Sequence, residues 1–258
     1  MQLQLYLRDS SGNIFPLMSE RLDSNAPLPT GETLPNWEIP PVPERAVLNG
    51  KYCRLEPLQA IRHAADLHRE FSPDAAAKNW TYLPYGPFST EQSYREWVEE
   101  KESLADPLLF AVVPLETETP AGVTGFLRFS PENGCIEIGH IHFAECLKCT
   151  PTATEAIALM LRHAFALGYR RCEWKCDSLN AASRRAALRY GFTFEGVFRK
   201  HVIYKGRNRD TAWYSIVDTD WEKLVPAFDR WLAPSNFDGN GIQRERLSEL
   251  TSSALSCE

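Results

Sequence analysis

Two polar residues in a basic stretch carry the first chemical signal of this sequence. Asn180 and Ser183 lie three positions apart in CDSLNAASRRAALRYGF, and residues at that spacing share one face of a helix. Between Asp177 and Asp210 there are eight Lys or Arg residues and three Asp or Glu residues, in a chain whose net charge is −6. Such a local positive surface suits a phosphorylated ligand, with a solvated helix face as the alternative.

A loop that leads into a helix is the second candidate site. The predicted strand that ends at Phe143 is followed by ECLKCTPT and by a helix that opens on Thr152, Ala153 and Thr154. The first N–H groups of a helix lack intrahelical partners and lie at the positive end of its dipole, so they bind anions such as pyrophosphate. An ordinary capped connection is the alternative.

The cysteine spacing does not favour a metal site. Of the seven cysteines, Cys146 and Cys149 are three positions apart, and Cys172 and Cys176 are four apart. The second pair falls on a predicted strand, where a rise of ~3.3 Å per residue separates the two by ~13 Å. Zinc requires each sulfur at ~2.3 Å. We therefore predict no metal, and we interpret the cysteines as reduced thiols of a cytoplasmic protein.

Composition narrows the class of protein further. No stretch approaches the ~20 apolar residues that a membrane span needs, and the first residues, MQLQLYLRDSSG, do not resemble a secretory leader. The net charge of −6 argues against general binding of duplex nucleic acid. Hydrophobic residues make up 43% of the chain, which is enough for a sizeable core.

Strands and helices alternate between about Leu48 and Trp231, and these elements must position the candidate residues. Ile157, Met160, Leu161, Ala164 and Phe165 have the spacing of an amphipathic helix. The order of elements predicts an α+β fold. Strands are expected over 108–115, 122–130, 135–143, 170–176, 192–204 and 211–218, and helices over 58–71, 94–104, 152–167, 180–190 and 220–232.

The two ends of the chain differ from this middle part. Seven of the 18 prolines lie at or before Pro43, so residues 1–45 are predicted to form an irregular arm. Residues 46–222 are predicted to form the folded domain. Residues 223–258 are predicted to complete the last helix, with Pro226 near its first turn, and to continue as a flexible tail with one weak helix around residues 245–250.

Several phrases, in this order of elements, resemble the GNAT superfamily of acetyl-CoA-dependent N-acetyltransferases. The resemblance is greatest to the branch of the ribosomal-protein alanine acetyltransferases (RimJ/RimL-like), and it covers about residues 46–222. It rests on NWTYLPYGPF, EIG at 137–139, TEA at 154–156, LGYRRCEWKCDSLNAASRRAA and KGRNRDTAWYSI.

The resemblance implies a GNAT fold, in which helices flank a central, mostly antiparallel twisted sheet, and it implies a site for acetyl-CoA. Backbone groups of Ile141, His142 and Phe143 would hold the pantetheine arm. The family's phosphate loop, Gln/Arg-x-x-Gly-x-Gly/Ala, corresponds to residues 148–153, where Pro151 replaces a glycine and removes one N–H. A proline is tolerated at the first position of a helix. The implied contacts from this loop and the following helices are Lys148, Cys149, Thr150, Thr152, Ala153, Thr154, Asn180 and Ser183.

The resemblance also implies catalytic roles. The tyrosine that serves many members as the general acid is replaced here by Ala187, so Ser183 is expected to protonate the leaving thiolate. The branch's glutamate base aligns with Val202. Glu137 is then the expected catalytic carboxylate.

The identity of the base stays open among three side chains and a water chain. Besides Glu137, the candidates are His140 and His142. Regular strand alternation would place Glu137, Ile141 and Phe143 on one face and both histidines on the other.

The acceptor is expected to bind beside aromatic residues. Trp80, Tyr82 and Tyr85 precede the second helix, in a region that walls the acceptor site in this family, and their polar tips suit a small amine or a peptide end. The resulting expectation is an N-acetyltransferase that transfers acetyl from acetyl-CoA to the primary amine of a small molecule or a protein N-terminus. It would act as a monomer or homodimer without nucleic-acid or membrane partners. A catalytically inactive acyl-CoA-binding or interaction module is the alternative.

Overall fold

The computed structural model describes residues 6–8, 14–16, 28–73 and 77–256 of the chain. Two compact units are present, Met1–Trp37 and Glu38–Glu258. In the first unit, β1 (Tyr6–Arg8) pairs antiparallel with β2 (Ile14–Pro16). The second unit holds all the other elements, and it begins at Glu38, ahead of the boundary predicted after residue 45.

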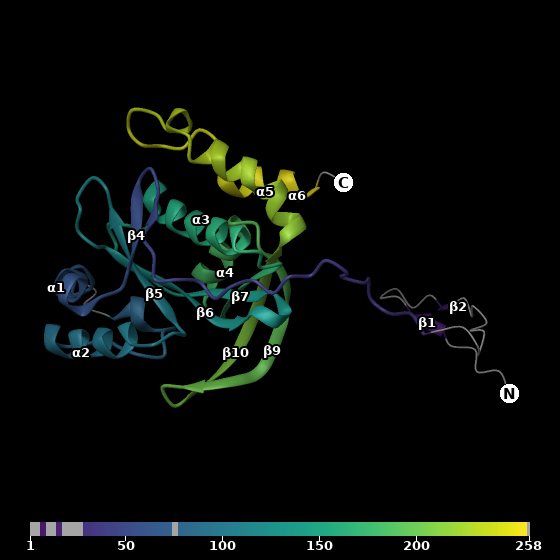
Figure 1. The fold of residues 1–258 in the computed structure, drawn as a ribbon, viewed down its shortest axis with the longest axis horizontal. Coiled ribbons are helices and arrows are strands. Elements are labelled where there is room, and N and C mark those ends of the chain that lie inside the picture. The colour runs from purple at the N-terminus through teal and green to yellow at the C-terminus, as the bar shows by residue number, and fades with distance from the viewer. Residues whose placement is uncertain (1–5, 9–13, 17–27, 74–76, 257–258) are drawn as a thin grey trace. The chain divides into compact units, whose positions relative to one another are not determined.

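An eight-stranded sheet forms the centre of the second unit (Figure 1). All neighbouring strands are antiparallel except β7 and β8, which are parallel. The predicted mostly antiparallel sheet is therefore confirmed. The strands follow the order β3 (Leu48–Asn49), β4 (Cys53–Pro57), β5 (Leu108–Pro114), β6 (Gly122–Ser130), β7 (Cys135–Phe143), β8 (Arg171–Asp177), β10 (Arg207–Val217), β9 (Thr193–Tyr204).

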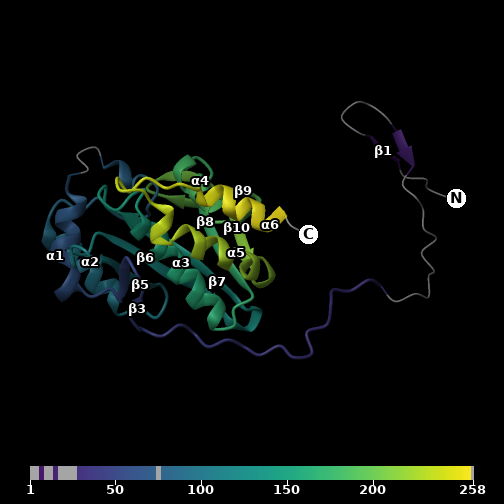
Figure 2. The ribbon, with the colours of Figure 1, turned by 90° about the horizontal axis from the view of Figure 1, so that it is seen from above.

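Helices cover both faces of the sheet, as the contacts of two residues of β4 show. The Cys53 thiol lies 3.8 Å from the Thr152 carbonyl of α3 (Pro151–Ala166), whereas Glu56 contacts His63 of α1 (Ala60–Phe71). Positions 53 and 56 have opposite parity, so α1 and α3 lie on opposite faces. Helix α2 (Glu91–Glu102) packs on α1. Helices α4 (Ala181–Arg189), α5 (Asp218–Trp231) and α6 (Leu247–Ser256) belong to the α3 layer (Figure 2).

The core follows the predicted periodicities. Ile157, Met160, Leu161 and Ala164 are buried on α3, as their spacing predicts, and residues 108–113 of β5 are all buried. A strand that is buried on both faces reads as a continuous apolar run, which explains LLFAVV.

Glu155, in the middle of the TEA phrase, holds the turn between β3 and β4. Its carboxylate is buried and accepts hydrogen bonds from the backbone N–H groups of Lys51, Tyr52 and Cys53, at 2.7, 2.6 and 2.9 Å. A β-carbon at Gly50 would collide with this carboxylate, so the turn requires glycine there. Glu155 therefore links α3 to the edge of the sheet.

The prediction of a flexible C-terminal tail is wrong for residues 234–256. Buried Asn236 donates to the carbonyls of Trp231 and Glu245 and accepts from the Glu245 N–H, which fixes the loop after α5. Leu247 of α6 is fully buried, and α6 packs on α4 and α5. Pro226, predicted near the first turn of its helix, lies in the interior of α5. No helix in the described part of the chain is long and apolar enough to span a membrane.

Candidate functional site

The parallel strands β7 and β8 pair over only part of their length. Cys135, Ile136 and Glu137 pair with Arg171, Cys172 and Glu173, and pairing then stops although both strands continue. Unpaired strand edges expose backbone donors and acceptors that must find other partners. The opening lies between two central strands of the sheet, where an extended ligand could supply those partners.

A series of ion pairs of alternating charge links the strands in the paired half. The Glu137 carboxylate accepts from Arg128 at 2.8 Å and lies 3.1 Å from the Lys175 ammonium, which also pairs with Glu173 at 2.6 Å. Arg171 extends the series by pairing with Glu173 and Glu195. We call these residues the charge chain: Arg128, Glu137, Lys175, Glu173, Arg171 and Glu195.

Two members of the charge chain are almost inaccessible to solvent. Glu137 is 3% exposed, and the Lys175 side chain is 8% exposed and lies over the Trp213 ring at 3.8 Å. Glu137, the expected catalytic carboxylate, thus has both oxygens engaged by cations.

A bulge interrupts β7 just beyond the paired half. Val123 of β6 pairs with His142 and Gly125 pairs with Gly139, so three steps on β7 face two on β6. The bulged segment of β7 therefore holds one extra residue and contains His140, whose φ is 53°. The predicted alternation is therefore wrong, because the bulge shifts the later residues by one. Glu137 and His142 share a face, and Phe143 lies on the other.

His140 forms a hydrogen-bonded pair with Tyr85. The Tyr85 hydroxyl lies 3.0 Å from His140 Nδ1, and the two rings stack at 5.6 Å. Burial, aided by the Arg128 and Lys101 cations, lowers the pKa of His140 to about 4. Burial also raises the pKa of the Tyr85 hydroxyl. Both groups are therefore uncharged at neutral pH.

The α1–α2 loop, described from residue 77, crosses the open end of the two strands. The Tyr82 hydroxyl donates to the Leu179 carbonyl at 3.1 Å, and the Lys205 ammonium donates to the Trp80 carbonyl at 2.8 Å. Trp80 itself is buried, edge-on to His142 at 4.1 Å. Of the three predicted acceptor residues, Tyr82 and Tyr85 present hydroxyl groups near the opening, whereas Trp80 packs in the core.

The first turn of α3 is a capped helix start. The Thr150 side chain accepts from the Ala153 N–H at 3.1 Å, and Pro151 occupies the first helical position, as expected. The Thr152 N–H consequently has no intrahelical partner.

The loop before α3 is held by side-chain contacts. Lys148 donates to Asn79 at 2.6 Å and pairs with Glu145 at 2.8 Å. Cys149 is exposed, with a φ of 61°. Thr154 lies deeper in the helix, where its hydroxyl accepts from Arg189 of α4.

The start of α4 brings Asn180, Ser183 and Trp174 together. Asn180 caps the helix, as predicted, and its Oδ1 accepts from the Ser183 N–H at 3.1 Å. The Ser183 hydroxyl accepts from Trp174 Nε1 at 2.9 Å. Burial raises the pKa of the Cys176 thiol, and a hydrogen bond with Ser183 opposes that shift. The serine oxygen therefore accepts from an indole N–H, and its own proton stays available for another partner.

Sequence reasoning missed the second role of Trp174. The alternation of Cys172, Trp174 and Cys176 correctly predicts a buried face of β8, and all three are buried. The indole N–H nevertheless reaches the next helix, nine positions along the chain. A tryptophan on an apolar strand face gives no sequence signal for such a contact.

Comparisons with known proteins agree with this geometry. The sequence profile of the acetyltransferase (GNAT) domain matches residues 53–193. A GCN5-related N-acetyltransferase from Brucella melitensis is 44% identical, covers 85% of this chain and all of its own, and superposes with a TM-score of 0.83.

Two further relatives are more distant. A Bacillus licheniformis protein described as the uncharacterized N-acetyltransferase p20 is 25% identical over 148 residues, which are 54% of this chain and 80% of its own. RimL, a ribosomal L7/L12 α-N-protein acetyltransferase, has a TM-score of 0.59 at 20% identity and covers 67% of this chain and 94% of its own. The likeness to RimL is one of fold.

Proposed function

The chain belongs to the GNAT family of acetyltransferases, and from that premise we propose that it transfers the acetyl group of acetyl-CoA to a primary amine. The amine is that of a small molecule or of a protein N-terminus. The observation that carries the proposal is the early end of β7–β8 pairing, because it leaves an opening between central strands with a helix N-terminus close in sequence to one edge.

The residues around the opening fit a ligand with a polar arm and phosphate groups. The unpaired edge of β7, including Ile141, His142 and Phe143, offers backbone partners to the amides of a pantetheine arm. The first turn of α3 offers the Thr152 N–H and the positive end of its dipole to phosphate. Pro151 costs no donor that the helix would otherwise use.

Basic residues near both helix starts favour the same ligand. Lys148 lies in the loop before α3, and Arg184 and Arg185 are exposed on α4. Asn180 uses its carbonyl oxygen to cap α4, which leaves its amide N–H₂ for a ligand. When bound, acetyl-CoA would supply the acetyl group as an activated thioester.

Ser183 is proposed as the general acid, with Trp174 as a positioning residue. Because the Ser183 oxygen accepts from Trp174 Nε1, its own proton must point elsewhere and is available for donation. The same geometry suits donation to the leaving thiolate of the cofactor.

Tyr85 and His140 are proposed to receive the acceptor amine in its neutral form. Two uncharged, mostly buried groups accept hydrogen bonds from an amine but do not stabilise an ammonium ion. Glu137 has its oxygens engaged by Arg128 and Lys175, so we assign it a positioning role at the base of the bulge. The acceptor ammonium therefore loses a proton to solvent water before it binds. When the neutral amine attacks the thioester carbonyl, the C–N bond forms and the C–S bond breaks, Ser183 would give its proton to the thiolate, and the proton released by the attacking nitrogen would restore Ser183 through water.

Calorimetric titration with acetyl-CoA tests the proposal. We expect micromolar binding by the wild type and loss of binding in the Asn180→Ala, Ser183→Ala double variant. With bound cofactor, the single variant Ser183→Ala should turn over any accepted amine about 100-fold more slowly, the lower range for loss of a general acid. Absence of acetyl-CoA binding by the wild type would overturn the proposal and favour an interaction module.

A further inference from the structure

The β9–β10 hairpin carries cations that the proposed reaction does not use. We infer that the acceptor is a primary amine that also bears a carboxylate or phosphate group, and that Arg207 and Arg209 bind this anionic group. The inference rests on the proposed function, since it names the class of amine that the same site accepts.

Strand register shows which face of the sheet these arginines occupy. Thr211 of β10 pairs with Asp177 of β8, and Trp213 pairs with Lys175. Between Arg209 and Thr211 the register with β9 shifts, but the extra residues belong to β9, and Arg209 donates to the Thr211 hydroxyl. The side chains at positions 207, 209, 211 and 213 therefore lie on one face, which is the face of Lys175. Lys175 in turn pairs with Glu137.

That face is the one covered by α1 and the α1–α2 loop. Glu137 shares its face of β7 with His142, which stacks on Phe71 of α1 at 3.8 Å. Arg207 and Arg209 therefore lie on the same side of the sheet as the α1–α2 loop that contains Tyr82 and Tyr85. A single acceptor could contact both regions.

The hairpin holds the arginines in place. Its turn, Lys205–Gly206, has φ values of 47° and 69°, the type I′ geometry that matches the twist of the strands. The Lys205 ammonium bonds to the Trp80 carbonyl and thereby fixes the tip to the α1–α2 loop. Arg209 donates from Nε to Thr211 at 3.1 Å, which leaves the terminal nitrogens of its guanidinium group for a ligand.

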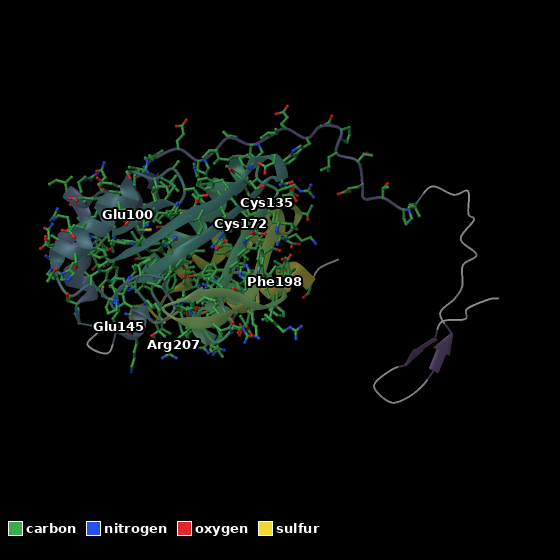
Figure 3. The ribbon with its side chains drawn as sticks, turned by 90° about the horizontal axis from the view of Figure 1, so that it is seen from below. Glu100, Cys135, Glu145, Cys172, Phe198 and Arg207 are labelled. Carbon is green, nitrogen blue, oxygen red and sulfur yellow. The ribbon has the colours of Figure 1, made fainter. Side chains whose placement is uncertain are left out.

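The nearby carboxylates are committed to other partners. Asp210 alternates onto the opposite face, where it accepts from the Lys200 N–H and from Asn208. Asp177 accepts from the Tyr204 hydroxyl and from the Leu179 N–H. Within the described residues, no carboxylate forms an ion pair with Arg207 or Arg209. Figure 3 shows Arg207 on the hairpin, with Cys135 and Cys172 toward the other end of the sheet.

Guanidinium groups favour an anionic ligand of planar or tetrahedral shape. They bind carboxylate and phosphate oxygens with two parallel hydrogen bonds. The chain has a net charge of −6, so without local cations it would repel an anionic acceptor. The acid could be a side chain next to a free peptide N-terminus or part of a small amino acid, and matched substrates distinguish these two sources.

Release of free CoA, measured with a thiol reagent, tests the inference on two matched pairs of amines. The first pair consists of pentapeptide amides with a free N-terminus, one with glutamates and one with glutamines at the second and third positions. The second pair is β-alanine and its amide. We expect the acidic member of at least one pair to have the higher kcat/KM, and we expect added sodium chloride to reduce that preference.

Charge reversal then locates the preference. The double variant Arg207→Glu, Arg209→Glu should lower the ratio of acidic to neutral kcat/KM about tenfold or more, equivalent to ~1.4 kcal/mol. Circular dichroism checks the fold of the variant. The control Lys223→Glu, Arg246→Glu changes the charge equally on exposed residues of α5 and the α6 approach, and should keep the wild-type ratio.

The two proposals fail in different ways. Equal use of acidic and neutral amines by the wild type, or an unchanged ratio in the hairpin variant, would overturn this inference and leave the proposed function standing. No CoA release from any amine, together with no acetyl-CoA binding, would overturn the proposed function and the inference with it.

Discussion

The two halves of the β7–β8 pair differ in what holds their strands. The paired half ends at Glu137 and Glu173 and is held by the charge chain, in which Lys175 lies between two carboxylates. In the open half, β7 and β8 no longer pair with each other, and β7 carries the bulge at His140.

This difference shows how a sheet can contain an opening between two central strands and still keep its structure. Breaking a central ladder forfeits hydrogen bonds and leaves backbone groups in need of partners. Here the buried ion pairs of Lys175 with Glu137 and Glu173 lie directly beside the break. The open half can therefore present His140 and the strand edges to a ligand while the paired half fixes the strands' position.

Replacing the central cation of the charge chain should have the largest effect. Lys175→Met would leave Glu137 and Glu173 without it in a mostly buried setting. Removing one partner of a buried pair costs about 3–5 kcal/mol. We expect a loss of that order in the free energy of unfolding, measured by urea denaturation.

Two variants sharpen this comparison. Lys148→Met removes an ammonium whose pair with Glu145 is exposed and should cost ~0–1 kcal/mol for that pair, with about 1 kcal/mol more for its hydrogen bond to Asn79. The double variant Glu137→Gln, Lys175→Met also removes one of the two carboxylates left without a cation, and should recover part of the lost free energy of unfolding. Equal costs for Lys175→Met and Lys148→Met would show that the two halves do not differ in this way.

The second expected effect concerns pH and the open half. The pKa of His140 is lowered to about 4 in the folded protein from an ordinary value of 6.5. As the pH falls below 6.5, the unfolded chain takes up this proton and the folded protein does not, so stability is lost between pH 6.5 and about 4. The free energy of unfolding at neutral pH is therefore about 3 kcal/mol higher than at pH 4 because of this one group.

Comparing variants isolates this contribution. His140→Asn should lose less stability than the wild type on acidification from pH 6.5 to 4, as measured by thermal unfolding across that range. Tyr85→Phe keeps the imidazole buried and should retain the wild-type pH dependence, because burial is the main cause of the shift. Parallel pH curves for wild type and His140→Asn would contradict the assignment.

Local pattern predicted much of this architecture, because helix and strand periods act over a few residues. The buried face of α3, the Asn180 cap, the position of Pro151 and the buried face of β8 all follow from nearest neighbours in sequence. The bulge at His140 could not be predicted in this way, since it depends on the register between β6 and β7.

Long-range contacts account for the other differences. The charge chain gathers residues from β6, β7, β8 and β9, and no sequence window contains them. The sequence around Glu137 gives no sign of Arg128 and Lys175, the two cations that engage its carboxylate. Residues 234–256 look polar in sequence, yet Asn236 and Leu247 bury them against α4 and α5.

The smallest expected effect comes from removing a single N–H group in the open half. Trp174→Phe keeps an aromatic ring in the core but removes the Nε1–H that orients Ser183. We expect kcat to fall about tenfold, equivalent to ~1.4 kcal/mol of transition-state stabilisation, while the KM for acetyl-CoA changes less. A purely structural role would instead lower the stability without this split between kcat and KM.

Trp213→Phe is the matched control, because its buried Nε1 has no hydrogen-bond partner among the residues that the structure describes, and its ring lies under Lys175 of the charge chain. Losing that N–H breaks no hydrogen bond, so kcat should stay near the wild-type value. If both tryptophan variants lose activity equally, packing of the ring is what matters and Trp174 does not position Ser183. If only Trp174→Phe is slowed, the side chain at the open half acts through its N–H, as the geometry of Ser183 requires.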